Sequence, residues 1–130
     1  MQTVTAQLSL TAHPGRVMLP AEGDAVAVVA KFFRALGDPA RLRLLGFLLH
    51  DEHTVTECVQ HIGLAQSRVS THLACLADCG YIQARRVGKH TFYRVAEPRV
   101  AQLVALAHIL AADNREALCA CHRIPPAAAS

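Results

Sequence analysis

One stretch, Gln66 to Gly80, constrains the fold more than any other part of this sequence. Its residues Val69, Leu73 and Leu76 recur at i, i+4 and i+7, which predicts a helix with an apolar inner side. Short polar side chains and one cation fill the N-terminal half of the same stretch. Gly80 follows as the residue type that most often ends a helix in a left-handed cap. The stretch is therefore expected to pack on a core with one side and to present polar groups on the other.

The polar half of this helix has the side chains that a DNA-reading helix needs. Hydroxyl, amide and guanidinium groups donate to phosphate oxygens and can read base edges in a major groove. A solvated helix has similar residues, so the prediction depends on the elements around it. The predicted DNA contacts on the helix are Gln66, Ser67, Arg68, Ser70, Thr71 and His72.

The segment before this helix has the pattern of a helix-turn-helix. Thr54 and Glu57 form a capping-box pair, a threonine at the cap and a glutamate three residues later. They open a short helix that is expected to end at Gly63. Two residues then form the turn into the helix at Gln66, so two helices meet across a tight turn.

A basic β-hairpin is predicted directly after the polar helix. Residues 81–86 and 90–95 have strand-like composition, and the three residues between them include a glycine at the turn. Residues 66–94 contain five basic residues and one acidic residue, a net charge of +4, whereas the whole chain carries +3. An anionic partner is therefore expected to meet this segment. The predicted contacts from this wing are Arg85, Arg86, Lys89 and His90.

Apolar helices are predicted near both ends of a single domain. A helix over residues 24–36 and a last helix over residues 98–118 both carry wide apolar faces. Since water solvates such faces poorly, the first and last helices are expected to form a homodimer interface. The predicted fold is mainly α with a β-hairpin wing, a winged helix-turn-helix of four helices, two strands and a last helix. Its parts are an N-terminal arm (1–20), the DNA-binding and dimerisation domain (21–118) and a flexible cysteine-containing tail (119–130).

Several classes of protein are disfavoured. No apolar run reaches the roughly 18 to 20 residues that span a bilayer, and no signal-peptide pattern begins the chain. We therefore expect a soluble, cytoplasmic protein without a membrane partner. A zinc hydrolase is disfavoured because the sequence has neither a histidine-rich triad nor a carboxylate base near its cysteines. The chain is not expected to be an enzyme.

The cysteines predict a metal site. The chain has five, an odd number, which fits a disulfide framework poorly and favours metal ligation or redox sensing. Cys75 and Cys79 stand four residues apart on the central helix, so their side chains meet on one face. Two thiolates can share a soft metal ion, and Cys119 or Cys121 in the tail can add a third.

The other candidate ligands carry less weight. Cys58 lies within the short third helix and is predicted to be a core residue. His122, next to the tail cysteines, is a candidate fourth ligand. The remaining histidines share no ligand spacing and are expected at the surface.

Two motifs of this chain resemble the ArsR/SmtB family of metal-responsive winged-helix repressors. They are the run from Phe33 to Leu45 and the run from Ser67 to Leu73, followed by a wing with Gly88 and Tyr93. The likeness spans roughly residues 24–118. It implies a dimer, paired through its first and last helices, that binds double-stranded operator DNA and is released by a metal. Ala65 departs from the family, which usually has a hydroxyl residue there to cap the recognition helix, so a weaker helix start is expected.

The run from His72 to Gly80 is similar to the cadmium- and lead-sensing CmtR branch of that family. There a C-terminal cysteine completes the helix pair. The resemblance implies Cd(II) or Pb(II) as the effector, with Hg(II), As(III) and Zn(II) as further candidates. It does not separate Cys119 from Cys121, nor a site within one chain from a site across the dimer. The alternative is a thiol-based redox or persulfide-sensing repressor on the same fold.

Overall fold

A computed structural model describes residues 22–126 of the chain. The predicted arm over residues 1–20 and the last four residues of the predicted tail lie outside the described residues. The elements follow in the order α1 (Glu22–Leu36), α2 (Pro39–Leu48), β1 (His53–Thr54), α3 (Val55–Ile62), α4 (Gln66–Asp78), β2 (Gln83–Val87), β3 (His90–Arg94), α5 (Pro98–Asp113) and α6 (Arg115–Ala120). Packing divides the chain after Lys31, so that residues 22–31 of α1 form a unit of their own.

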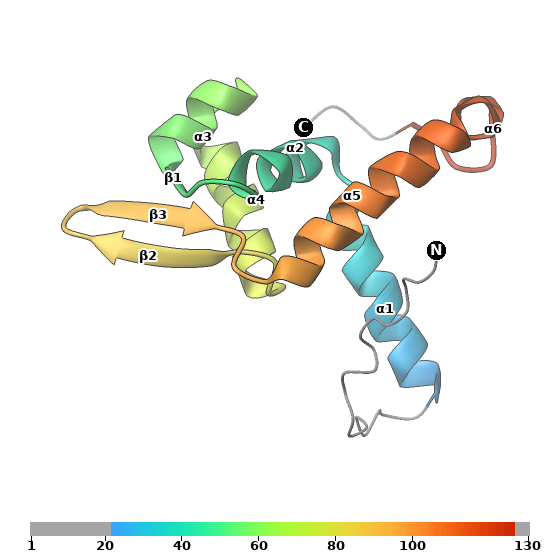
Figure 1. Cartoon of the computed structure of the whole chain (residues 1–130), viewed down its shortest axis with the longest axis horizontal. Coiled ribbons are helices and arrows are strands. Elements are labelled where there is room, and N and C mark those ends of the chain that lie inside the picture. The colour runs from blue at the N-terminus through green and yellow to red at the C-terminus, as the bar shows by residue number, and fades with distance from the viewer. Residues whose placement is uncertain (1–21, 127–130) are drawn as a thin grey trace. The chain divides into compact units, whose positions relative to one another are not determined.

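The predicted winged helix-turn-helix is confirmed in the unit that starts at Phe32. Helices α3 and α4 form the helix-turn-helix, and β2 and β3 extend from it as the wing (Figure 1). The three strands form one antiparallel sheet in the order β1-β3-β2. Strand β1 was not predicted, because two residues are too few to show a strand period. It attaches the wing to the segment before α3.

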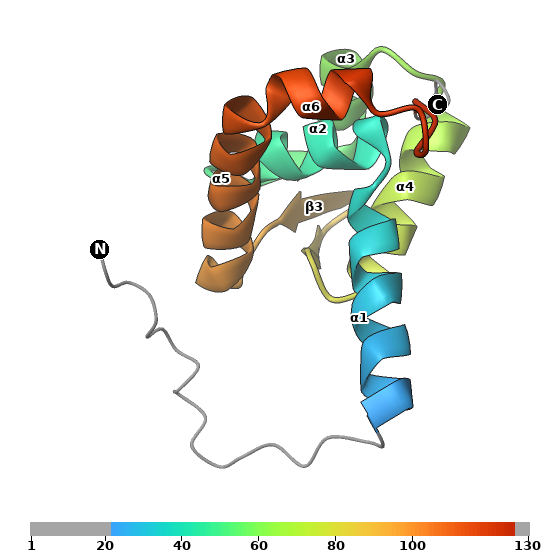
Figure 2. The ribbon, with the colours of Figure 1, turned by 90° about the vertical axis from the view of Figure 1, so that its right-hand side faces the viewer.

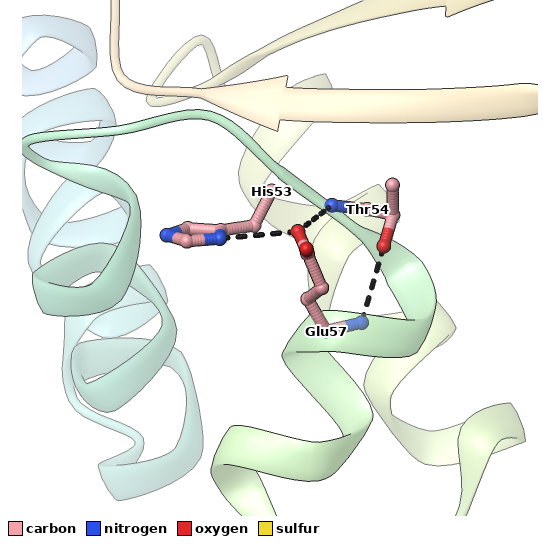
Figure 3. Close-up of polar contacts among 3 residues, drawn as sticks. All are labelled: His53, Thr54 and Glu57. Carbon is pink, nitrogen blue, oxygen red and sulfur yellow. Dashed lines mark hydrogen bonds and ion pairs between the residues drawn. The ribbon is translucent and has the colours of Figure 1, made fainter.

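Side-chain caps determine where α2 and α3 begin. Asp38 accepts from the backbone nitrogens of Ala40 at 2.8 Å and Arg41 at 3.2 Å, which starts α2. The predicted capping box of α3 is confirmed (Figure 3). The backbone nitrogen of Glu57 donates to Thr54 Oγ1 at 3.2 Å, and the backbone nitrogen of Thr54 donates to Glu57 Oε1 at 3.0 Å.

Helix α4 packs its apolar side into the core, as predicted. Val69, Leu73 and Leu76 are all fully buried. This placement fixes the rotation of α4 about its axis, and therefore turns its polar residues outward. The other buried side chains come from α1, α2, α3, α5 and the segment after α4: Ala35, Ala40, Leu44, Leu45, Leu48, Cys58, Ile62, Tyr81, Ile82, Val100 and Val104.

The predicted unbroken last helix is wrong at Asn114. Helices α5 and α6 are separate, and the backbone of Asn114 between them has φ −108° and ψ 20°. The side-chain amide of Asn114 donates to the carbonyl of Leu110 at 2.9 Å. Such local bonds compete with helix continuation, and the chain changes direction there (Figure 2). No helix within residues 22–126 is long and apolar enough to cross a bilayer.

Candidate nucleic-acid interface and thiol site

The N-terminal half of α4 presents polar side chains to solvent. Five of the six residues that were predicted to contact DNA are exposed: Gln66, Ser67, Arg68, Ser70 and Thr71. Residue Ala65 at the helix start provides no side-chain hydrogen bond, as its departure from the family pattern predicted. The first N–H groups of α4 therefore lack a side-chain cap, and the positive end of the helix dipole can receive a phosphate oxygen.

His72, the sixth residue, is half-buried and contacts α2. Its Nδ1 lies 3.3 Å from the guanidinium Nη1 of Arg41. Because arginine can only donate, Nδ1 must accept, and the proton of the neutral imidazole is then on Nε2. Arg41 also donates from Nε to the carbonyl oxygen of Ala35 at 2.6 Å, so one guanidinium joins the end of α1 to α4.

The wing carries the remaining predicted DNA contacts, all of which are exposed. Arg86, Lys89 and His90 lie at or next to the turn, where Gly88 has φ 61°. Arg85 differs from them because its guanidinium pairs with both carboxylate oxygens of Glu52. This pairing raises the pKa of Arg85 and lowers that of Glu52.

The two cysteines of α4 lie at the opposite end of the helix from the polar residues. Cys75 is half-buried and Cys79 is exposed, so neither sulfur is sealed in the core. They are one helical turn apart, and the backbone nitrogen of Cys79 donates to the carbonyl oxygen of Cys75 at 3.0 Å. Gly80, with φ 85°, then ends the helix in the predicted left-handed cap.

Tyr81 lies beside this pair and was not predicted from the sequence as a site residue. It is 1 % exposed, and its hydroxyl donates to the carbonyl oxygen of Phe32 at 2.7 Å. Burial, followed by the nearby Cys79 and Cys75, raises the pKa of Tyr81 to about 12. The sequence did contain a signal for Tyr81, because it directly follows the capping glycine Gly80, where an apolar side chain often packs back on the helix.

The tail thiols lie on a different element. Cys119 is exposed in the last turn of α6, and Cys121 and His122 follow it, also exposed. Among residues 22–126 of a single chain, no three histidine, cysteine, aspartate or glutamate side chains converge as a metal site. Cys58 is fully buried, and burial raises its pKa to about 11, which confirms its prediction as a core residue.

Helix α5 has an apolar side that the rest of residues 22–126 leaves exposed. Val100 and Val104 are buried, at 8 % and 3 % exposure. Leu106, Ile109 and Leu110, further along the helix, are 52 to 58 % exposed. Contiguous exposed apolar residues of this kind mark an interaction surface.

Residues 38–84 match the sequence profile of the bacterial regulatory proteins of the arsR family. The chain is 62% identical over 96 residues to a probable mercury resistance operon repressor of Streptomyces lividans, a match that covers 74% of this chain and 77% of that protein. It is 33% identical over 98 residues to the HTH-type transcriptional regulator CmtR of Mycobacterium bovis, a match that covers 75% of this chain and 83% of that protein. A homodimeric winged helix-turn-helix DNA-binding domain of Mycobacterium bovis, solved by NMR, matches with a TM-score of 0.66 and 29% identity, covering 77% of this chain and 92% of that one.

Proposed function

The chain belongs to the arsR family of bacterial regulatory proteins, and we propose that it is a homodimeric repressor which releases operator DNA when its thiolates bind a soft metal ion. The observation that carries the proposal is the division of α4. Exposed polar groups occupy its N-terminal half, and the accessible thiols of Cys75 and Cys79 occupy its C-terminal end. One rigid element thereby joins a DNA-reading surface to a metal-binding one. It acts as a regulator, not as an enzyme, and we expect it to work in the cytoplasm.

In this proposal the N-terminal half of α4 enters the major groove, and the wing lies over the adjacent phosphates or minor groove. The exposed amide, hydroxyl and guanidinium groups of α4 read base edges and bind phosphates. Arg86, Lys89 and His90 add positive charge from the wing. His72 acts with Arg41, so it fixes the position of α4 as well as facing the DNA.

Homodimerisation is proposed to involve the first and last helices. The exposed leucines and isoleucine of α5 support this interface, as does the exposed apolar segment of α1 that includes Val26, Val28 and Val29. A two-fold dimer places its two recognition helices roughly 34 Å apart, about one turn of the duplex. Operator half-sites are expected to have that spacing.

For the effector we propose Hg(II). The relative with 62% identity is named a mercury resistance operon repressor. Hg(II) also forms stable complexes with two thiolates, the number that one turn of α4 brings together. Cd(II) and Pb(II), which the resemblance of the run from His72 to Gly80 implies, normally take more ligands and would require Cys119 or Cys121. The tail thiol can come from the same chain or from the second copy, and As(III) and Zn(II) are weaker candidates.

Release follows if the thiolates that hold the ion shift the end of α4. Cys79 caps the C-terminus of that helix, and two residues later Tyr81 fastens the chain to the carbonyl of Phe32 near the end of α1. Drawing the two sulfurs together therefore changes how the end of α4 is held. A coupling free energy of roughly 1–3 kcal/mol, typical of such systems, would lower DNA affinity about 5- to 150-fold.

Operator binding under a series of ions tests this function. The affinity of the dimer for its promoter DNA is measured by fluorescence anisotropy with Hg(II), Cd(II), Pb(II) or Zn(II), each in metal-buffered solution. We expect nanomolar-range binding without metal, strong weakening by Hg(II), and a thiolate-to-metal absorption band. Arg68→Ala should weaken DNA binding without changing the band. Binding that no thiophilic ion affects would contradict the proposal.

A redox or persulfide sensor is the second candidate, and the exposure of Cys79, Cys119 and Cys121 supports it. Exposed thiols oxidise readily when they are ionised. Under chelation, peroxide or a persulfide donor should then release DNA while Hg(II) should not be required. Mass spectrometry of the treated protein would identify the disulfide.

A further inference from the structure

The wing arginine Arg85 contacts two groups of the protein, the carboxylate of Glu52 and the ring of Phe92. Its Nε donates to Glu52 Oε2 at 3.1 Å, and its Nη2 pairs with Glu52 Oε1. The carbon at the centre of its guanidinium lies 5.2 Å from the centroid of the Phe92 ring. A two-bond carboxylate pair over an aromatic ring holds a guanidinium in one orientation.

The register of the sheet explains why these groups meet. Arg85 lies opposite Phe92, and Phe92 lies opposite Thr54, so the three form one row across β2, β3 and β1. Residues directly opposite one another share a face of the sheet. Glu52 directly precedes β1, two residues before Thr54, and so lies at the edge of the sheet opposite to β2. The interaction therefore spans the sheet from the wing's outer strand to the segment that enters α3.

Charge strengthens the same interaction. The hydrogen bonds from Arg85 are the main cause of the lowered pKa of Glu52, and Arg94 on β3 adds a smaller effect. The carboxylate therefore stays ionised below the usual range for a glutamate. Glu52 occupies two N–H donor positions of Arg85 and offsets its positive charge locally, so Arg85 is a weaker phosphate ligand. Among residues 22–126, the adjacent Arg86 has no carboxylate partner and donates to the carbonyl oxygen of Gly88 at 3.1 Å.

We propose that Glu52 is a positioning residue of the DNA interface, which holds Arg85 and so fixes the wing relative to the helix-turn-helix. Arg85 then orients the hairpin and does not bind phosphate, while Arg86 and Lys89 bind the phosphates that the wing reaches. The inference rests on the proposed DNA binding for its consequence, but the ion pair itself can be tested in the protein alone. Arg85 is then no longer one of the residues that bind DNA. Glu52, an acidic residue that a search for basic DNA contacts would pass over, becomes part of the interface.

Two measurements on four variants test the inference. The variants are Glu52→Gln, Arg85→Gln, the double variant, and Arg86→Gln as the matched control one residue along the same strand. Hydrogen exchange of the amides of β2 and β3 is measured in the free dimer by mass spectrometry or NMR. The salt dependence of affinity for a fluorescein-labelled random-sequence DNA duplex is measured for wild type, Arg85→Gln and Arg86→Gln.

The expected exchange of the hairpin amides is up to roughly fivefold faster in Glu52→Gln and in Arg85→Gln, the range for an exposed ion pair. The double variant should be no faster than either single variant, because both substitutions remove the same ion pair. Arg86→Gln loses only its bond to the carbonyl of Gly88, so any faster exchange should be confined to the hairpin turn and should not reach the amides of Arg85 and Phe92. Its salt slope should fall by about 0.9 for each phosphate that Arg86 no longer neutralises, roughly two per dimer, while that of Arg85→Gln stays at the wild-type value.

Either of two results would overturn the inference. One is a decrease of the salt slope in Arg85→Gln that equals the decrease in Arg86→Gln, which would show that Arg85 binds phosphate. The other is unchanged hairpin exchange in both Glu52→Gln and Arg85→Gln, which would mean that the pair does not hold the wing. If the wild-type dimer fails to bind any duplex, the proposed function is wrong, and the exchange data still decide whether Glu52 positions the wing.

Discussion

Removing the hydroxyl of Tyr81 should destabilise the fold by an amount that the structure sets. The phenol is 1 % exposed, and its O–H donates to the carbonyl of Phe32 at 2.7 Å. Tyr81→Phe deletes this bond and keeps the ring, which packs 4.8 Å from the ring of Phe32. The loss should therefore be that of one buried hydrogen bond, about 0.5–1.5 kcal/mol, without a cavity term.

The assay is urea unfolding, followed by circular dichroism at one fixed protein concentration, because the stability of a dimer depends on concentration. The midpoint should fall while the slope with urea stays constant. Tyr93→Phe, at a half-buried tyrosine of the wing, is the matched control and should change the free energy of unfolding by less than about 0.5 kcal/mol. Equal stability of Tyr81→Phe and wild type would refute the argument that this bond fastens Phe32 to the end of α4.

Three further predictions concern helix ends. Glu97 caps α5, and hydrogen bonds from Arg99 lower the pKa of Glu97 to about 2. Because the folded state favours the ionised carboxylate, the stabilisation that Glu97 provides is complete above pH 4.5 and is lost as pH falls toward 2. Glu97→Gln should therefore flatten the acid limb of a stability–pH profile in that window. Thr54→Ala removes the acceptor for the N–H of Glu57 and should cost about 1 kcal/mol in thermal unfolding. Ala65→Ser supplies the side-chain cap that α4 lacks, and the backbone at residue 65 already has φ −59° and ψ 147°. The free energy of unfolding should therefore rise by about 1 kcal/mol. No gain in stability would show that this helix start needs no cap.

The parts of the fold that local signals determine were predictable from the sequence. The capping box at Thr54, the left-handed glycines at Gly63 and Gly80, and the buried face of α4 all depend on residues within a few positions of one another. The exposure of the polar half of α4 followed from the same periodicity. The break at Asn114 was missed because the apolar pattern continues across it, although an asparagine in a helix interior is a signal for competing local bonds.

The interactions that shape the site join residues far apart in the sequence and could not be predicted. Glu52 and Arg85 are 33 residues apart, and Phe32 and Tyr81 are 49 apart. No local pattern marks such a pair, because each residue alone has the character of an ordinary surface or core residue. Sequence periodicity could therefore place Arg85 on the wing but could not show that a carboxylate already holds it.

The most direct test of the central claim compares operator affinity with and without one equivalent of Hg(II) per site in wild type, Cys75→Ser, Cys79→Ser and Cys58→Ala. The buried Cys58 controls for thiol number, because it lies in the core and outside the proposed site. Hg(II) should weaken DNA binding in wild type and Cys58→Ala, about 5-fold or more at a typical coupling free energy, and should have no effect in either α4 variant. An undiminished response in both Cys75→Ser and Cys79→Ser would contradict the claim that metal capture on the recognition helix causes release.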